Sequence, residues 1–218
     1  DMYASAPGLV PLQLNDEQTY LETVAVAQEF SGLPVRIDIL KARKVGVSTW
    51  VEAYCYRRTK EEPNRRALVC ANDSEGSSAI WRMAQRYWDN DASHLPTKSG
   101  SPTERAIEYK APHSSSFAVR TAGTKTLQRG DTLDFLHASE LAFWPYAGET
   151  ALSVFNAVAK GTHSAVFIES TANGVGGEFY DRWHAAKDHR RRDPGSLDGF
   201  EPVFFSWLDH PPYRAAGP

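Results

Sequence analysis

Short apolar segments alternate with segments of helical spacing along most of this 218-residue chain. The expected strands cover 35–40, 66–71, 106–110, 116–121, 133–138, 164–170 and 202–207, and the expected helices cover 15–31, 49–58, 74–88, 147–160 and 177–188. The two short strands at 106–110 and 116–121 are close enough to form a hairpin. Elsewhere, strands that alternate with helices indicate an α/β fold, with a mostly parallel central sheet flanked by helices on both faces.

Composition limits the class of protein further. Hydrophobic residues make up 41% of the chain, enough for the sizeable core of one domain. A net charge of -3 argues against a protein that binds nucleic acid over its whole surface, but it leaves a local basic patch open. No apolar run approaches the roughly 18 residues of a membrane span, and the start lacks a secretory signal. Cys55 and Cys70 lie in apolar segments and are expected to be buried, reduced thiols.

The segment between the first strand and the next helix carries a pattern close to a phosphate-binding loop. It reads Lys41-Ala42-Arg43-Lys44-Val45-Gly46-Val47-Ser48. The usual P-loop is G-x-x-x-x-G-K-[ST], whose backbone N–H groups surround phosphates. Gly46 and Ser48 match, whereas Val47 stands at the lysine position and Lys41 at the first glycine. Because such a loop curls round the phosphates, a lysine at its start could reach them.

Two interpretations of this loop stay open. A K-x-x-x-x-G-x-S pattern occurs by chance in many proteins, and a basic cluster facing solvent is common. Yet Lys41, Arg43 and Lys44 precede a helix, and basic residues at a helix N-terminus form an anion site.

A second segment of chemical interest follows the strand at 133–138. It ends in Ser139-Glu140, which resembles the acidic pair of ATPases with the first acid replaced by serine. The second acid polarises the attacking water, a role that Glu140 fits. Ser139 could keep a weaker, water-mediated link to Mg²⁺. Alternatively, Glu140 merely begins a helix, stabilised by the helix dipole. His137 is expected to be a strand residue, since no G-x-S-x-G elbow surrounds Ser139.

A third segment is glycine-rich and follows the strand at 164–170. Small polar side chains at the carboxyl end of a parallel strand lie where open α/β sheets bind ligands. Asn173 could therefore hydrogen-bond a γ-phosphate or the attacking water. The alternative is an ordinary Asn-Gly turn.

Taken in order, these segments resemble the N-terminal ATPase domain of phage terminase large subunits. Residues 170–177, with the aromatic residues that follow, resemble the coupling motif of that family, and 136–144 resembles its Walker B region, including the branch with serine in place of aspartate. The loop at 41–48 is similar to a variant Walker A whose lysine has moved to the front. Residues 12–18 resemble the segment with the adenine-recognising glutamine, and 204–207 resembles the stretch before the nuclease domain. The resemblance spans essentially the whole chain.

The resemblance implies a P-loop NTPase fold of the ASCE type. Residues 1–200 would form the ATPase domain, and 201–218 would form its final strand and the start of a linker toward a nuclease domain. A single acid near the end has no visible partners, so we expect no nuclease activity. The chain would then be an excised domain or a truncated product.

The resemblance also implies ATP and Mg²⁺ as cofactors and assigns roles to particular residues. Lys41 would neutralise the β- and γ-phosphates, Ser48 would bind Mg²⁺ together with Ser139, and Glu140 would activate water. Asn173 would sense the γ-phosphate and link hydrolysis to domain movement. The ATP-binding residues would be Gln18, on the adenine, and Lys41, Ala42, Arg43, Lys44, Val45, Gly46, Val47, Ser48 and Thr49.

Such motors resemble ring ATPases, in which a neighbouring subunit donates an arginine to the transition state. Arg129 matches the family position best, with Arg120 as a fallback, although an exposed arginine paired with a surface acid is the alternative. DNA contact is expected through the phosphate backbone and to be salt-sensitive. Arg57, Arg58, Arg65 and Arg66, or Arg190, Arg191 and Arg192, are candidates, with a solvated basic face as the alternative.

The implied function is an ATP-hydrolysing motor that drives double-stranded viral DNA into a procapsid. Its partners would be DNA, the portal protein, the small terminase subunit and copies of itself in a homo-oligomeric ring, with no membrane, in the host cytoplasm. One rival is another P-loop translocase or a helicase-type ATPase, although no D-E-A-D-like box is visible. A second rival is a non-catalytic nucleotide-binding assembly module, which the departures at Val47 and Ser139 would favour.

Overall fold

The computed structural model describes residues 10–99, 105–123 and 132–210. Its helices are α1 (Asp16–Phe30), α2 (Val47–Glu61), α3 (Ser74–Asp89), α4 (Ala147–Phe155) and α5 (Glu178–Arg192), with a 3-10 helix, η1 (Leu141–Phe143). Its strands are β1 (Val35–Lys41), β2 (Arg66–Ala71), β3 (Ala106–Glu108), β4 (Ser116–Thr121), β5 (Phe135–Ser139), β6 (Ala165–Ser170) and β7 (Glu201–Phe205). The strands and helices alternate as the sequence predicts.

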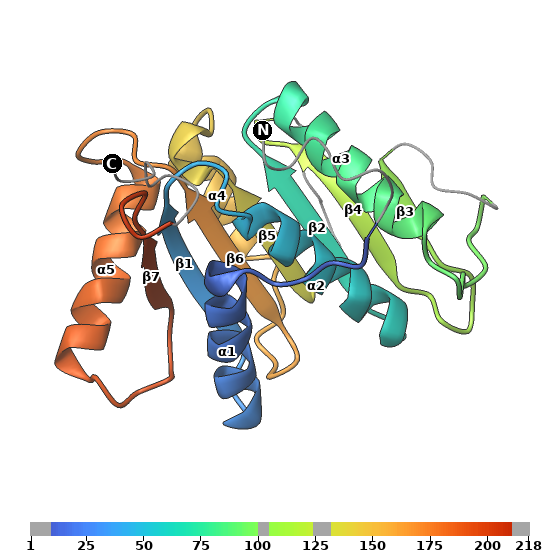
Figure 1. Ribbon diagram of the computed structural model, residues 1–218, viewed down its shortest axis with the longest axis horizontal. Helices are drawn as coiled ribbons and strands as arrows, with labels where there is room; N and C mark the ends of the chain where they lie inside the picture. Colours follow the sequence, from blue (N-terminus) through green and yellow to red (C-terminus); the bar gives the residue numbers. More distant parts are fainter. Residues whose placement is uncertain (1–9, 100–104, 124–131, 211–218) are drawn as a thin grey trace, which may run out of the picture.

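The strands form one sheet in the order β3-β4-β2-β5-β6-β1-β7 (Figure 1). Among the described strands of this sheet, β3 and β4 pair in antiparallel fashion, which confirms the expected hairpin, and the other strand pairs are parallel. β6 lies between β1, which leads into the candidate phosphate loop, and β5, which leads into Glu140. The predicted α/β class, with a mostly parallel central sheet, is confirmed.

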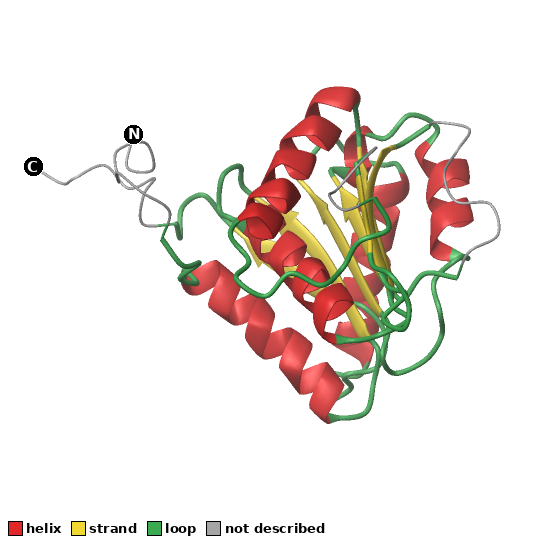
Figure 2. Ribbon diagram, turned by 90° about the vertical axis from the view of Figure 1, so that its right-hand side faces the viewer, coloured by secondary structure: helices red, strands yellow, loops and turns green. Residues whose placement is uncertain are grey.

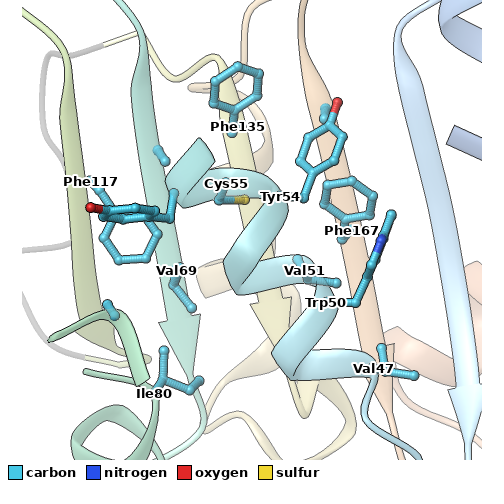
Figure 3. Packing of buried hydrophobic residues seen from close by; sticks show 14 of the residues in the cluster. Val47, Trp50, Val51, Tyr54, Cys55, Val69, Ile80, Phe117, Phe135 and Phe167 are labelled. Carbon is cyan, nitrogen blue, oxygen red and sulfur yellow. The ribbon is translucent and has the colours of Figure 1, made fainter. Parts of the chain in front are cut away.

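Helices cover both faces of the sheet (Figure 2). One hydrophobic core lies under α1, α2 and α3, and a second lies under α4, α5 and η1. Successive side chains of a strand point to opposite faces, so each buried strand contributes to both cores. Helix α2 packs on the first face through positions 47, 50, 51 and 54, whose spacing places them on one side of a helix (Figure 3). They lie against strand residues such as Phe135 and Phe167.

Several boundaries differ from the sequence-based expectation, among them those of three helices. Helix α2 begins at Val47 rather than at 49, because Gly46 adopts a left-handed conformation and serves as its N-cap. Helix α4 ends at Phe155 rather than near 160, because the chain then turns back and Ala159 donates a backbone hydrogen bond to Leu133, beside the start of β5. Helix α5 continues to Arg192.

The last strand belongs to the same sheet as the rest. β7 pairs in parallel with β1, so residues 201–205 form the sheet edge next to the loop strand. Residues 206–210, where the start of a linker is expected, form no helix or strand, and 211–218 lie outside the described residues. Among the helices of the described ranges, none combines the length and apolarity that crossing a membrane requires.

Asp38 is a buried acid on the face of β1 that α5 covers. It lies beside a small cavity of about 230 Å³, lined also by Arg182 and His189, and its Oδ1 atom has no hydrogen-bond partner among the described residues. Burial raises the pKa of Asp38 to about 7, although the charge of Arg182 opposes the shift. The folded chain therefore holds a proton on Asp38 at pH values where the unfolded chain has released it.

From this raised pKa we predict a pH-dependent gain in stability for Asp38→Asn. The wild-type free energy of unfolding should fall as the pH rises from about 4 to about 7, because there the unfolded chain binds fewer protons. Asparagine does not titrate, so the free energy of unfolding of the variant does not show this fall. The difference in unfolding free energy, variant minus wild type, should grow by on the order of 2 kcal/mol between about pH 5 and about pH 8. Urea denaturation of both proteins measures it, and a difference independent of pH would contradict the raised pKa.

Candidate functional site

The loop between β1 and α2 curls because two of its residues are left-handed. Lys44 has φ 58° and Gly46 has φ 81°. A side chain at Gly46 would also displace that of Gln18, because its Cβ would lie 2.7 Å from Gln18 Nε2. Among the described residues, no side chain forms a capping hydrogen bond at the N-terminus of α2. The first backbone N–H groups of a helix have no partner within it, so the loop presents donors suited to an anion.

Gln18 and Asn15 hold this loop against α1. The Gln18 Nε2 atom donates to the carbonyl of Gly46 at 2.8 Å, and the Asn15 Nδ2 atom donates to that of Val45 at 3.2 Å. The side-chain oxygen of Gln18, Oε1, accepts a hydrogen bond from the backbone N–H of Asn15 at 3.0 Å. Gln18 thus positions the loop in this structure, and its contact with adenine stays a prediction.

Lys41 lies at the start of the loop, and its side chain points toward the acids at the ends of β5 and β6. As the last residue of β1, it places its Nζ atom 3.0 Å from Glu140 Oε1 and 3.4 Å from Glu169 Oε2. A pocket of about 280 Å³ opens beside it, lined by Lys41, Arg43, Lys44, Asn72, Glu140, Phe143 and Thr171. Val47, at the usual lysine position, instead packs in the core with 1% of its surface exposed (Figure 3). The cation nearest Glu140 therefore comes from position 41.

Glu140 follows β5 directly and is held on both carboxylate oxygens. Oε1 pairs with Lys41, while Oε2 accepts the Thr171 backbone N–H at 3.0 Å and its hydroxyl at 3.2 Å. The backbone of Glu140 is left-handed, with φ 54°. Residues in this region cost conformational energy and are concentrated at functional sites. The carboxylate is thus fixed between the loop strand and the carboxyl end of β6.

A column of buried polar side chains lies beneath α2. His137 and Ser139 on β5 and Glu169 on β6 share the sheet face toward α2, where Ser48 and Glu52, four residues apart, point to the sheet. Glu169 Oε1 accepts hydrogen bonds from the hydroxyls of Ser48 at 2.6 Å and Ser139 at 2.9 Å. His137 bridges two acids, with Nε2 3.1 Å from Glu169 Oε1 and Nδ1 2.6 Å from Glu52 Oε1.

Lys41, His137 and Glu169 stabilise one another's charged forms, whereas burial raises the pKa of Glu52. Burial lowers the pKa of His137, but its hydrogen bonds to Glu169 and Glu52 more than reverse this and raise the pKa to about 9. Burial raises the pKa of Glu169, but Lys41 and His137 hold it well below its usual range. The pKa of Lys41 is raised by Glu169 and Glu140 despite burial. The site therefore holds an ionised Glu169 between two cations at neutral pH.

Asn173 connects the glycine-rich loop to the segment after Glu140. Its Nδ2 atom donates to the carbonyl of Ala142 in η1 at 2.8 Å. The predicted coupling residue and the predicted water-activating residue therefore belong to neighbouring, hydrogen-bonded segments. Whether Asn173 senses a γ-phosphate stays a prediction.

The predicted arginines do not join this site in the described residues. Arg129 lies outside the described residues. Arg120 is on β4, where its guanidinium donates to the backbone carbonyls of Val119 and Arg105. Most of the arginines considered for DNA contact form ion pairs with nearby acids. Arg58 pairs with Glu29 and Glu62, Arg65 with Glu62 and Asp134, Arg190 with Glu201, and Arg191 with Asp188. This pairing supports the interpretation of a solvated basic face.

The sequence motifs single out neither Glu169 nor Glu52, and Glu169 is the one in direct contact with Ser48. An acid inside a strand whose neighbours are apolar is unusual, because a buried carboxylate needs a cation or several donors. That signal was present in Phe167-Ile168-Glu169. The sequence does not show, however, that Glu169 lies opposite Ser139 in the sheet.

The residues present fit Mg–ATP. Glu169 Oε2 is buried without a hydrogen-bond partner among the described residues and faces Lys41, and Ser48 offers a hydroxyl on the first turn of α2. Within the same residues no three His, Cys, Asp or Glu side chains converge to hold a metal by themselves. Nucleotide-bound Mg²⁺ does not require such a cage, since it keeps several waters and binds the phosphates with one or two protein ligands.

The sequence matches no protein-family model and no curated protein. Solved structures are similar to it nonetheless. The large terminase of bacteriophage HK97 matches with a TM-score of 0.64 and 13% identity, covering 89% of this chain and 40% of the HK97 protein. The large terminase of a thermophilic bacteriophage, solved in complex with ADP, matches with a TM-score of 0.61 and 10% identity over 90% of this chain and 46% of that protein.

A match to an isolated domain shows which part of these proteins is shared. The large terminase ATPase domain of Thermus phage P74-26 has a TM-score of 0.56 and 19% identity, covering 91% of this chain and 88% of that domain. The chain spans less than half the length of the HK97 protein and of the ADP-bound terminase. It therefore has the fold of the ATPase domain of phage large terminases.

Proposed function

We propose that this chain is the ATP-hydrolysing motor domain of a viral DNA-packaging enzyme. The fold it shares with large terminase ATPase domains supports this, and so does the ADP complex of the terminase from the thermophilic bacteriophage. The observation that carries the proposal is the position of Lys41, which lies 3.0 Å from Glu140 beside the curled loop. A basic side chain and a candidate water-activating acid thus share one pocket, despite the valine at position 47.

Each residue of this pocket has a chemical task in the proposal. Bound Mg–ATP supplies the phosphoanhydride bond to be broken and a divalent charge that stabilises the phosphates. Lys41 would bind the β- and γ-phosphates together with the N–H groups of the loop, and the Ser48 hydroxyl, together with Ser139, would hold Mg²⁺. Glu140 accepts the proton of the attacking water on its carboxylate. Because Lys41 also pairs with Glu140, phosphate binding and release of that carboxylate are linked.

The remaining parts of the proposal follow the resemblance. Gln18 contacts the adenine, and Asn173 transmits the presence of the γ-phosphate to η1 through its hydrogen bond to Ala142. A neighbouring subunit of a homo-oligomeric ring donates an arginine, with Arg129 as the first candidate. Double-stranded DNA, the portal protein and the small terminase subunit are the proposed partners, in the host cytoplasm.

The proposal is tested by measuring ATP binding and turnover separately. We expect a fluorescent ATP analogue to bind this chain in the presence of Mg²⁺. Phosphate release should be Mg²⁺-dependent and should rise more steeply than linearly with protein concentration, because association brings in the neighbour's arginine. Arginine fingers contribute roughly 10³- to 10⁵-fold where measured in related enzymes, so dilute protein should turn over very slowly.

The outcomes also separate the rival functions. Failure to bind ATP at any Mg²⁺ concentration would overturn the proposal. Binding without turnover, even at high protein concentration and with DNA present, would favour a non-catalytic assembly module. Turnover stimulated by single-stranded rather than double-stranded DNA would favour a helicase-type motor.

A further inference from the structure

The acid that is missing from the end of β5 has a spatial replacement on the neighbouring strand. Ser139 on β5 and Glu169 on β6 are paired positions in the parallel register. Resting on the function proposed above, we propose that Glu169 performs the task of the absent first acid: it orients the Ser48 hydroxyl and supports the hydration shell of Mg²⁺. Glu169 is then a positioning residue contributed by a different strand from the one that usually provides this acid.

The hydrogen bonds of Glu169 fit this role. Ser48 donates to Oε1 at 2.6 Å, a length typical of a hydroxyl bonded to an ionised carboxylate. Because a hydroxyl has only one proton, this bond turns the Ser48 lone pairs away from Glu169 and leaves them to bind a cation. Glu169 Oε2 accepts no hydrogen bond within the described residues, although Lys41 Nζ lies 3.4 Å away. One oxygen thus fixes the serine, and the other is buried beside the Lys41 ammonium and keeps unused acceptor capacity.

The glutamate at 169 explains why position 139 carries a serine and not a second acid. Adjacent strands lie about 4.8 Å apart, so two carboxylates at these paired positions would repel each other in a buried site. The Ser139 hydroxyl instead donates to Glu169 Oε1 at 2.9 Å. The departure from the usual acidic pair therefore moves the carboxylate from one strand to the next rather than removing it.

The surroundings of Glu169 keep it ionised and fixed. Its side chain is completely buried, which an isolated carboxylate would not tolerate. His137 donates to it from β5, and Glu52 on α2 holds the other nitrogen of that imidazole. His137 and Glu52 thereby fix the position of Glu169 relative to Ser48, which lies one helical turn before Glu52.

The experiment measures how much Mg²⁺ strengthens nucleotide binding, which needs no turnover. The affinity for a fluorescent ATP analogue is compared in excess Mg²⁺ and in EDTA for each variant. Glu169→Gln should reduce the strengthening by Mg²⁺ roughly 10- to 100-fold, as is typical when a group that orients a metal ligand is lost. Its affinity in EDTA should stay within a few-fold of wild type. Asp38→Asn, which changes a buried acid on the opposite face of the sheet, is the matched control and should keep the full effect.

Placing a carboxylate on β5 in place of the one on β6 should restore the strengthening of nucleotide binding by Mg²⁺. The double variant E169Q/S139D carries one acid at the paired positions, as wild type does, and we expect it to recover Mg²⁺-strengthened binding. Recovery distinguishes a positioning role from a merely structural one. If E169Q does not fold, as judged by circular dichroism, the double variant decides the question alone.

The measurements distinguish failure of the proposed ATPase function from failure of the role proposed for Glu169. Wild-type protein that shows no Mg²⁺-strengthened binding would overturn the proposed ATPase function and this inference with it. If wild type shows the effect and folded E169Q keeps it, the role of Glu169 is wrong while the ATPase function stands. A folded double variant without the effect would also overturn the replacement of one acid by the other.

Discussion

Replacing Glu140 with glutamine should lower ATP turnover by about 10²- to 10⁴-fold, the usual contribution of a general base. Glutamine keeps the size and the hydrogen-bonding capacity of the side chain, but it cannot accept the proton of the attacking water. ATP binding should be kept or become tighter. Lys41 Nζ lies 3.0 Å from Glu140 Oε1, so the amide frees the ammonium from a competing carboxylate. Single-turnover phosphate release and analogue binding measure the two effects.

A nearby glutamate provides the control for this variant. Glu149 is exposed in the first turn of α4, and Glu149→Gln removes the same charge without touching the pocket. It should leave turnover within about two-fold of wild type, because an isolated surface charge contributes little. If Glu140→Gln retained wild-type turnover, the assignment of water activation to Glu140 would be wrong.

The strands and the loop were predictable because they depend on local patterns. The apolar run at 66–71 coincides with β2, and the glycine at 46 does mark a left-handed turn before a helix. The boundary of α4 was not predictable from periodicity, because it is set by pairing of the following chain with Leu133. Long-range contacts of this kind leave no local signal.

The candidate site also contains residues that local patterns predict and one that they do not. Lys41, Ser48 and Glu140 were predicted from their places at strand and helix ends, and the structure brings them to one side of the sheet. Glu169 was missed because its importance depends on strand order. Only when β6 lies between β1 and β5 does its face meet both Ser48 and Ser139. The serine at 139 looked like a loss of function in the sequence, whereas the register shows a carboxylate beside it.

Replacing Lys41 should weaken ATP binding by roughly 10- to 150-fold. A hydrogen bond to a charged group contributes about 1.5–3 kcal/mol, and tenfold in affinity corresponds to about 1.4 kcal/mol. Lys41→Met keeps the length of the side chain and removes the charge. It also leaves Glu140 and Glu169 without their shared cation, and breaking a buried pair can cost about 3–5 kcal/mol of stability. Binding is therefore best measured in Lys41→Met and in the double variant with Glu140→Gln, which removes the unpaired charge of Glu140.

Arg43 and Lys44 are the controls that decide which cation replaces the usual P-loop lysine. Both line the same pocket, but their side chains are exposed, whereas that of Lys41 is 8% exposed. Water screens an exposed charge, so Arg43→Met and Lys44→Met should each weaken ATP binding less than about tenfold. The buried ammonium of Lys41 is therefore the cation whose loss should weaken ATP binding most. If Lys44→Met had the larger effect, the phosphates would be bound from the middle of the loop, and the ion pair of Lys41 with Glu140 would be a structural one.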